Sequence, residues 1–217
     1  MLEEVRGKIV AAARRAGRDP GEVKLVAVTK GHTPEEIEAS VLRHGCSVLG
    51  ENRIQEWREK APALEGHEVE WHYIGNLQRN KVKYCAPFHT IHSLNSRRLA
   101  DELQRQAQRL EHRFRVMVEV NVAGEETKQG VALAEAPELV EHARSLEGLE
   151  VAGLMTMAPH SEDPEASRPV FAALRELRDT LGLEELSMGM SNDFEVAVEE
   201  GATIVRVGSA IFDGRRP

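Results

Sequence analysis

Near the N-terminus the chain reads Lys24-Leu25-Val26-Ala27-Val28-Thr29-Lys30-Gly31-His32, a short apolar run that ends at a lysine. The run contains two β-branched valines and is typical of a buried strand. Because side chains alternate along a strand, Val26, Val28 and Lys30 share one face. The next residues, Thr33-Pro34-Glu35-Glu36, indicate a helix with Thr33 as its N-cap. We therefore expect a strand–loop–helix unit whose loop carries a lysine.

Lys30 is a candidate nucleophile. Partial desolvation at the end of a packed strand frees a lysine amine and suits it to Schiff-base formation. The alternative is a lysine that simply extends from the strand end into solvent. The rest of the chain has to decide between these two interpretations.

Composition limits the class of protein. The 217 residues include 41% hydrophobic and 29% charged residues, which is ordinary for a globular protein. The formal net charge of −8 argues against a broad nucleic-acid surface and against an anionic membrane partner. The N-terminus lacks the pattern of a signal peptide, and no apolar run approaches the length of a membrane span.

The two cysteines, Cys46 and Cys85, stand in dissimilar contexts without metal-ligand spacing. We interpret them as reduced thiols in a cytoplasmic protein, and we expect no metal site. A monomer is favoured, although the oligomeric state is left open.

Seven further strand-like runs follow the first, and each is continued by a helical pattern or turn. They are expected at residues 47–51, 70–75, 90–94, 114–122, 151–157, 186–190 and 203–207. Alternating strands and helices predict a parallel sheet, and eight such units predict a TIM-type (β/α)8 barrel. No G-x-G-x-x-G follows a strand, which disfavours a doubly wound open sheet.

No linker divides the chain, so residues 1–217 are expected to form a single domain. A helix within residues 1–20 lies outside the barrel count and is expected to cover the bottom of the barrel. Asn52 is expected to cap the helix that contains Ile54, and Asn76 to begin the helix after the third strand.

Closure of the barrel places its last strand beside its first. Arg206, Gly208 and Ser209 then become neighbours of Lys30, and Ser191 lies next along the same rim. In such barrels this rim holds the active sites, and the loops after strands seven and eight commonly bind phosphate. Hydroxyl groups and backbone N–H groups at Ser191 and Gly208-Ser209 predict a phosphate site.

By strand alternation, Arg206 points into the barrel. A buried guanidinium requires acceptors for its hydrogen bonds. One interpretation is an ion pair with Glu51 or Glu119. The other interpretation is a site for pyridoxal 5′-phosphate (PLP). Its aldehyde would meet the Lys30 amine, its phosphate the predicted phosphate site, and its pyridine nitrogen Arg206.

Several segments resemble one known family. They are Ala27-Val28-Thr29-Lys30, Gly50-Glu51-Asn52-Arg53-Ile54-Gln55-Glu56, Trp71-His72-Tyr73-Ile74-Gly75-Asn76-Leu77-Gln78-Arg79-Asn80-Lys81, Ile91-His92-Ser93-Leu94, Gly153-Leu154-Met155, Leu186-Ser187-Met188-Gly189-Met190-Ser191 and Val205-Arg206-Val207-Gly208-Ser209-Ala210-Ile211-Phe212. In unchanged order they resemble the pyridoxal phosphate homeostasis protein family, also called the proline synthase co-transcribed or YggS-like family.

The resemblance implies a barrel like the N-terminal domain of alanine racemase, without the β-domain of that enzyme. It implies that Lys30 forms the Schiff base and that Arg206 is the partner of the pyridine nitrogen. It further implies a set of residues that bind the phosphate or line the pocket: Ser191, Gly208, Ser209, Asn52 and His72.

Three positions depart from the family pattern. Thr29 stands where serine is common, and Asn192 replaces a frequent aspartate. Asp213 is an extra residue that puts the shape of the last loop in question.

The resemblance favours a PLP carrier that buffers the cofactor or delivers it to PLP-dependent apo-enzymes. An amino-acid racemase is the alternative, and it would need a base opposite Lys30, for which Tyr73 is a candidate. A regulatory module that binds a protein partner is a third hypothesis.

Overall fold

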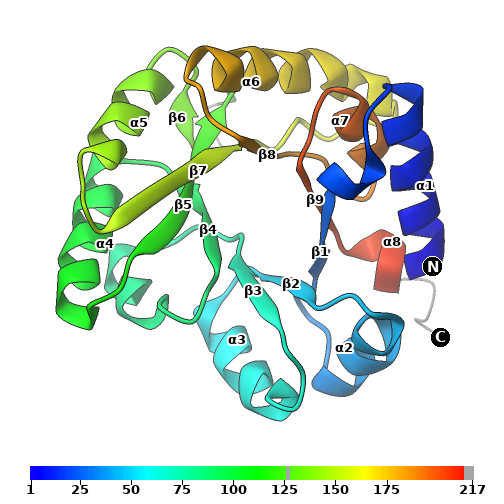
Figure 1. The fold of residues 1–217 in the computed structure, drawn as a ribbon, viewed down its shortest axis with the longest axis horizontal. Helices are drawn as coiled ribbons and strands as arrows, with labels where there is room; N and C mark the ends of the chain where they lie inside the picture. The colour runs from blue at the N-terminus through cyan, green and yellow to red at the C-terminus, as the bar shows by residue number, and fades with distance from the viewer. Residues whose placement is uncertain (126–127, 213–217) are drawn as a thin grey trace.

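The computed structural model describes residues 1–125 and 128–212, and it confirms the predicted barrel (Figure 1). Within these residues the strand order is β4-β3-β2-β1-β9-β8-β7-β5, and β4 also pairs with β5, which closes the ring. Every barrel pairing is parallel. The barrel strands are β1 (Lys24–Val28), β2 (Val48–Glu51), β3 (Glu70–Tyr73), β4 (Thr90–Leu94), β5 (Phe114–Asn121), β7 (Leu149–Met155), β8 (Glu185–Ser187) and β9 (Ile204–Val207).

Helices surround the ring in the order that the sequence predicts. They are α1 (Leu2–Arg15), α2 (Pro34–Ser40), α3 (Ile54–Lys60), α4 (Arg97–Leu110), α5 (Ala136–Arg144), α6 (Arg168–Thr180), α7 (Phe194–Glu199) and α8 (Ser209–Phe212). Thr33 caps α2 through a capping box with Glu36, as its sequence pattern indicates. The short strand β6 (Val131–Ala132), which pairs with β5, was not expected.

Two predicted helix starts are wrong. The N-cap of α3 is Arg53, and Asn52 makes no capping bond to the helix. After β3 the chain forms a 3-10 helix, Arg79–Tyr84, whose N-cap is Gln78, so Asn76 does not begin a helix. Both asparagines lie in the loops that leave the strands, and the helical turn forms two or three residues later.

The strands separate two cores. Side chains that point outward, such as Ala27, Leu49 and Trp71, pack against the helices in the main core. Val26, Met117, Met155 and Ile204 form a second and smaller cluster on the opposite face of the strands, inside the barrel. The apolar runs of the sequence arise because both faces of each strand are buried.

Helix α1 does not lie across the bottom of the barrel, which corrects the sequence expectation. It packs beside α7 and α8 on the outer wall (Figure 1). Arg15 forms ion pairs with Glu195 and Glu199 of α7, and the Arg18 guanidinium donates to the carbonyl oxygens of Val198 and Ala202.

Across the described ranges no helix is both long and apolar enough to cross a membrane. The expected effect of Asp213 falls outside those ranges.

Candidate functional site

The pairing of β1 with β9 brings together residues from the two ends of the chain. Val26 is the partner of Arg206 and Ala27 is the partner of Val207, in parallel register. Lys30 follows β1, and Gly208 follows β9. A Cβ atom at Gly208 would lie 3.2 Å from Cβ of Val28. The predicted pairing of the first strand with the last is therefore confirmed, and Lys30 follows this pair at the carboxyl end of the barrel.

The backbone on both sides of Lys30 is held in place. The Thr29 hydroxyl donates to Glu51 Oε1 at 2.6 Å, and the N–H of Gly31 donates to Glu56 Oε2 at 3.1 Å. Gly31 has a φ of 78°, a conformation that favours glycine. The side chain of Lys30 itself is exposed. The protein alone therefore does not supply the desolvation that the sequence analysis expects for this amine.

A buried ion pair also holds the backbone beside Lys30. Lys60 Nζ donates to Glu51 Oε1 at 2.5 Å and to the carbonyl oxygen of Thr29 at 2.7 Å. Both charged side chains are buried, with Lys60 7% exposed and Glu51 fully enclosed. Glu51 is thus the partner of Lys60, and the sequence-based alternative of an ion pair between Glu51 and Arg206 is wrong.

Arg206 is buried inside the barrel, as strand alternation predicts, and is 4% exposed. Its guanidinium donates to Ser187 Oγ at 2.6 Å and to the carbonyl oxygen of Thr156 at 3.0 Å. Both acceptors are neutral, and no ion pair joins Arg206 to a described carboxylate. Burial lowers the pKa of Arg206 to about 10, although the charges of Glu119 and Asp193 oppose this shift.

Glu119 on β5 is the second carboxyl group that the sequence offered to Arg206. It is buried, and its Oε2 atom has no hydrogen-bond partner among the described residues. Burial raises the pKa of Glu119 to about 7, and the charge of Arg206 only partly offsets this effect. A carboxyl group with this pKa is partly neutral near pH 7, so it compensates the guanidinium incompletely.

The predicted phosphate residues meet at the loop after β9. Ser191 Oγ accepts hydrogen bonds from the N–H groups of Gly208 and Ala210, both at 3.3 Å. The loop of Ser191 is held by Asp193, whose Oδ1 accepts from the N–H of Met190 at 2.7 Å. The side chain of Ser209 is exposed beside this group.

Asn52, which follows β2, is half-buried at the same end of the barrel. Its Oδ1 atom is buried and has no partner among the described residues. The backbone around it is crowded, because a Cβ atom at Gly75 would lie 2.1 Å from the carbonyl oxygen of Asn52. Asn52 therefore presents a fixed acceptor without a protein donor.

His72 belongs to a chain of polar groups that crosses the barrel interior. Its Nδ1 atom lies 2.7 Å from His92 Nε2, and His92 Nδ1 lies 2.8 Å from Ser187 Oγ. His72 Nε2 lies 2.8 Å from Oε1 of Glu70, at the amino end of the barrel. Arg206 and His72 are thus linked only through His92 and Ser187, and a direct role of His72 in the pocket stays a prediction.

The protons of this chain can be assigned from its ends. Burial lowers the pKa of His72 and lowers that of His92 well below its usual value, while the His72 hydrogen bond lowers the pKa of Glu70 to about 2. An ionised Glu70 requires a proton on His72 Nε2. His72 Nδ1 then accepts from His92 Nε2, and His92 Nδ1 accepts from the Ser187 hydroxyl.

Tyr73 is not placed to act as a base opposite Lys30. It lies in the outer core, its hydroxyl donates to the carbonyl oxygen of Asn76 at 3.2 Å, and its ring packs edge-on against Phe88. Burial raises the pKa of Tyr73 to about 12. The sequence-based candidate for a racemase base is therefore wrong.

Sequence spacing gave no role to the residues that contact Arg206 and the Lys30 loop. Lys60 and Thr156 belong to no motif, and Ser187 lies in a segment that carries the family resemblance without an assigned role. The buried position of Lys60 follows from its place on the inner face of α3. The partners of these residues come from other strands, and spacing in the sequence does not reveal such pairs.

Comparison with known proteins agrees with this arrangement. The pattern of the family described as "Alanine racemase, N-terminal domain" matches residues 2–216. A protein of Aquifex aeolicus named pyridoxal phosphate homeostasis protein is 47% identical over 222 residues, which cover 99% of this chain and 97% of that protein.

Two solved structures extend the comparison. PipY of Synechococcus elongatus, in a structure described as having PLP bound, has a TM-score of 0.83 and 32% identity over 94% of this chain and 99% of PipY. Alanine racemase of Clostridium difficile has a TM-score of 0.69 at 14% identity, over 94% of this chain and 55% of that enzyme, and shows a shared fold alone. The chain belongs to the pyridoxal phosphate homeostasis protein family, whose barrel is the one found in the N-terminal domain of alanine racemase.

Proposed function

We propose that the protein binds PLP at the carboxyl end of the barrel, with Lys30 as the Schiff-base lysine, and that it stores and delivers the cofactor without catalysing a reaction. Relatives with the name pyridoxal phosphate homeostasis protein and the PLP bound to PipY support this proposal. A cytoplasmic location, where the buried and unpaired Cys46 and Cys85 stay reduced, is part of it.

The observation that carries the proposal is the unbalanced charge of Arg206. Two hydrogen bonds to neutral oxygens use only two of the five N–H donors of the guanidinium. A buried cation with neutral partners is unfavourable unless a ligand supplies an acceptor. Arg206 sits on the strand beside β1, which leads to Lys30.

The other residues fit the same cofactor. The orphaned Oδ1 atom of Asn52 is an acceptor for a phenolic or other hydroxyl donor. The absence of a side chain at Gly208 leaves room against Val28, where a Cβ atom would be crowded. Ser191 and Ser209 bring hydroxyl groups to the loop after β9, and a phosphate accepts hydrogen bonds from such groups.

Each group has a distinct role in this proposal. When bound, PLP would supply an aldehyde with which a lysine amine can condense, with loss of one water molecule. Lys30 supplies this amine on a backbone that Glu51, Glu56 and Lys60 hold in position. Arg206 would hold the ring nitrogen by donating a hydrogen bond to it, which would disfavour protonation of that nitrogen and limit the ring as an electron sink.

The position of Tyr73 favours a carrier over a racemase. A racemase needs acid–base groups on both faces of the substrate. Tyr73, the candidate for the second face, is buried among the helices and keeps its proton. Lys30 therefore acts without a tyrosine partner from β3.

Absorption spectroscopy tests the binding site. The purified protein is expected to be yellow, and borohydride reduction followed by peptide mass mapping is expected to find the cofactor on Lys30. Lys30→Ala should abolish the visible band, whereas the exposed Lys8→Ala should keep it. A reduced adduct on another lysine, such as Lys128, would refute the assignment.

Two assays test the carrier role. Incubation with a PLP-dependent apo-enzyme should restore the activity of that enzyme, and the loaded protein should racemise none of a panel of amino acids appreciably. Racemisation with a turnover of about 1 s⁻¹ or more, as in ordinary enzymes, would contradict the carrier role.

A further inference from the structure

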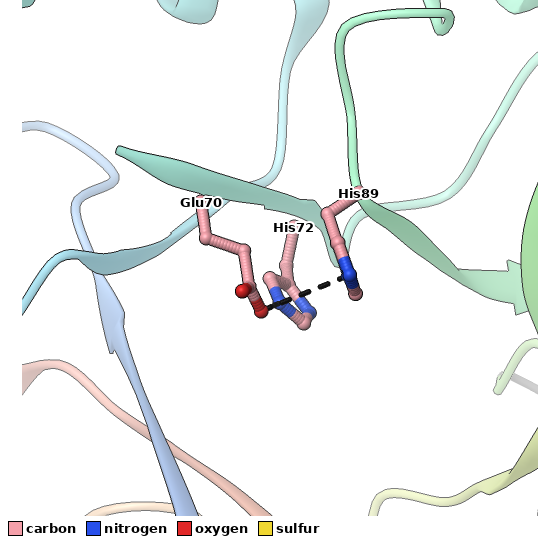
Figure 2. Close-up of side chains that lie close together, drawn as sticks. All are labelled: Glu70, His72 and His89. Carbon is pink, nitrogen blue, oxygen red and sulfur yellow. Dashed lines mark hydrogen bonds and ion pairs between the residues drawn. The ribbon is translucent and has the colours of Figure 1, made fainter. Parts of the chain in front are cut away.

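Three side chains with metal-binding groups meet at the amino end of the barrel, away from Lys30. Glu70 begins β3, His72 lies two residues later on the same face, and His89 precedes β4. Figure 2 shows the three side chains directed toward one another. We propose that Glu70, His72 and His89 bind one divalent transition-metal cation of the zinc type. The sequence spacing Glu-x-His followed by a distant histidine is too common to have predicted this site.

The donor atoms are close to the spacing that such a cation needs. Glu70 Oε1 lies 2.8 Å from His72 Nε2 and 3.7 Å from His89 Nδ1, and one donor atom of each residue lies within 4.8 Å of the other two. Donors about 2.0–2.2 Å from a tetrahedral zinc ion are about 3.4 Å apart. The site therefore forms when the Glu70 and His72 donors separate by about 0.6 Å and His89 moves inward.

The His89 side chain can turn inward on a backbone whose N–H is held by the carbonyl oxygen of Trp71 at 2.7 Å, and its ring already stacks on that of His72. Its side chain is 46% exposed, and it lies on the loop that enters β4. Its present polar neighbour besides Glu70 is the hydroxyl of Thr90, 2.9 Å from Nδ1. Glu70 and His89 also line a surface pocket, so an ion reaches them from solvent.

The surroundings of His72 are those of a metal ligand. A histidine that binds a metal almost always donates its other ring N–H to a protein acceptor. His72 Nδ1 lies 2.7 Å from His92 Nε2, which accepts when His92 carries its proton on Nδ1 and donates to Ser187 Oγ. Metal binding then requires both histidines to change tautomer, and neither gains nor loses a proton.

The ammonium group of Lys24 already pairs with the carboxylate of the proposed metal site. Lys24 Nζ lies 2.6 Å from Glu70 Oε1, the atom that faces both histidines. The ammonium competes with a metal ion for the same oxygen. Because the Lys24 side chain is 36% exposed, it can turn into solvent when a divalent ion binds. Two imidazoles and one carboxylate favour zinc and its neighbours over magnesium or calcium, which prefer oxygen ligands.

Equilibrium dialysis of the full chain against Zn²⁺ tests the site. The expected result is one ion per chain, with affinity at least tenfold weaker in Glu70→Gln and in His89→Gln. The matched control is His44→Gln, an exposed histidine elsewhere, which should bind as the parent does. Circular dichroism checks that each variant is folded. Zinc affinity that is unchanged in both Glu70→Gln and His89→Gln would overturn the proposal, as would the absence of zinc binding by the parent chain.

The competition with Lys24 gives a second test. Lys24→Met should bind Zn²⁺ at least threefold more tightly, because the competing ammonium is gone. Co²⁺ in place of zinc should give the intense visible absorption of a tetrahedral site, and His89→Gln should lose it. If the cluster is only an ion-pair network, Lys24→Met destabilises the fold without strengthening metal binding, and the proposal fails.

Discussion

Lys60 on α3 and Arg206 inside the barrel are both buried cations, but their partners differ. Lys60 is bound to the carboxylate of Glu51 at 2.5 Å, whereas Arg206 is bound to a hydroxyl and a carbonyl oxygen. The first cation is neutralised within the protein and holds the loop of Lys30 in place. The second cation lacks a fully ionised partner, because burial keeps Glu119 partly protonated. Lys60 therefore stabilises the fold, whereas Arg206 is available to a ligand.

The two cations therefore differ in their expected contribution to stability. The pKa of Arg206 is lowered to about 10, which corresponds to about 3 kcal/mol of unfavourable free energy for the charged form at neutral pH. Its two hydrogen bonds offset this amount, at about 1.5–3 kcal/mol each for a charged donor. The Lys60 ammonium, by contrast, has a carboxylate at contact distance.

The largest effect is expected from Lys60→Met. This change leaves Glu51 buried without its cation, which destabilises a protein by about 3–5 kcal/mol. Arg206→Met is the comparison variant, and its two opposing contributions should leave stability within about 1 kcal/mol of the parent. Urea denaturation at pH 7 measures both variants. Equal losses of stability would show that the two cations do not differ in the way described.

Retention of PLP, unlike stability, should be affected more by Arg206→Met than by Lys60→Met. Arg206→Met should release PLP, because the ring nitrogen loses its partner, while stability is kept. Visible absorption after dialysis measures the retained cofactor. Retention equal to that of the parent would remove Arg206 from the site.

The second prediction concerns the pH dependence that Glu119 causes. In the unfolded chain this carboxyl group titrates near 4.5, and in the folded protein its pKa is about 7. Between these values the folded state binds more protons, so the free energy of unfolding falls as the pH rises from 4.5 to 7. The contribution is present below pH 4.5 and is lost above pH 7, with a total of about 3 kcal/mol.

Glu119→Gln should remove this slope. Urea denaturation of parent and variant at several values between pH 4.5 and 8 measures the difference, which should grow with pH up to about 7 and then stay constant. Parallel curves would mean that Glu119 is ionised in the folded protein. It would then neutralise Arg206 in the way that Glu51 neutralises Lys60.

The pairing of the strand that leads to Lys30 with the strand that carries Arg206 could be predicted because it depends on topology alone. Eight alternating units imply a closed barrel, and closure places the last strand beside the first. The inward direction of Arg206 followed from strand alternation. These inferences require the period of the apolar pattern and the number of units, and both can be read from a single sequence.

The partners of the charged groups could not be predicted in the same way. The sequence left Glu51 and Glu119 as candidates for an ion pair with Arg206, and neither forms one; Glu51 instead pairs with Lys60, which approaches it from α3. The expected cap at Asn52 and the expected helix start at Asn76 were wrong, because the helical turns begin two and three residues further along the chain. The partners of charged groups and the helix starts depend on how the elements pack together. Local residue propensities do not contain this information.

The smallest effects on stability are expected from substitutions of Ser191 and Ser209, near the loop after β9. These two serines again compare a group that the protein engages with one that it leaves available. The Ser191 hydroxyl oxygen accepts from the N–H groups of Gly208 and Ala210, while the Ser209 side chain is exposed. Both bonds of Ser191 are long at 3.3 Å, so Ser191→Ala should cost only about 0.5–1 kcal/mol of stability. Ser209→Ala should leave stability unchanged within about 0.5 kcal/mol, as at most surface positions.

Cofactor affinity should rank the two serines differently from stability. A hydroxyl that is not engaged by the protein is available to a phosphate, so Ser209→Ala should weaken PLP retention by about 1–3 kcal/mol, the value of a hydrogen bond to a charged group. Titration of each variant with PLP, followed by absorption, measures this loss. If Ser209→Ala retains PLP as the parent does, the lack of a protein partner does not identify a ligand-binding group. The same inference for Arg206 would then be weakened.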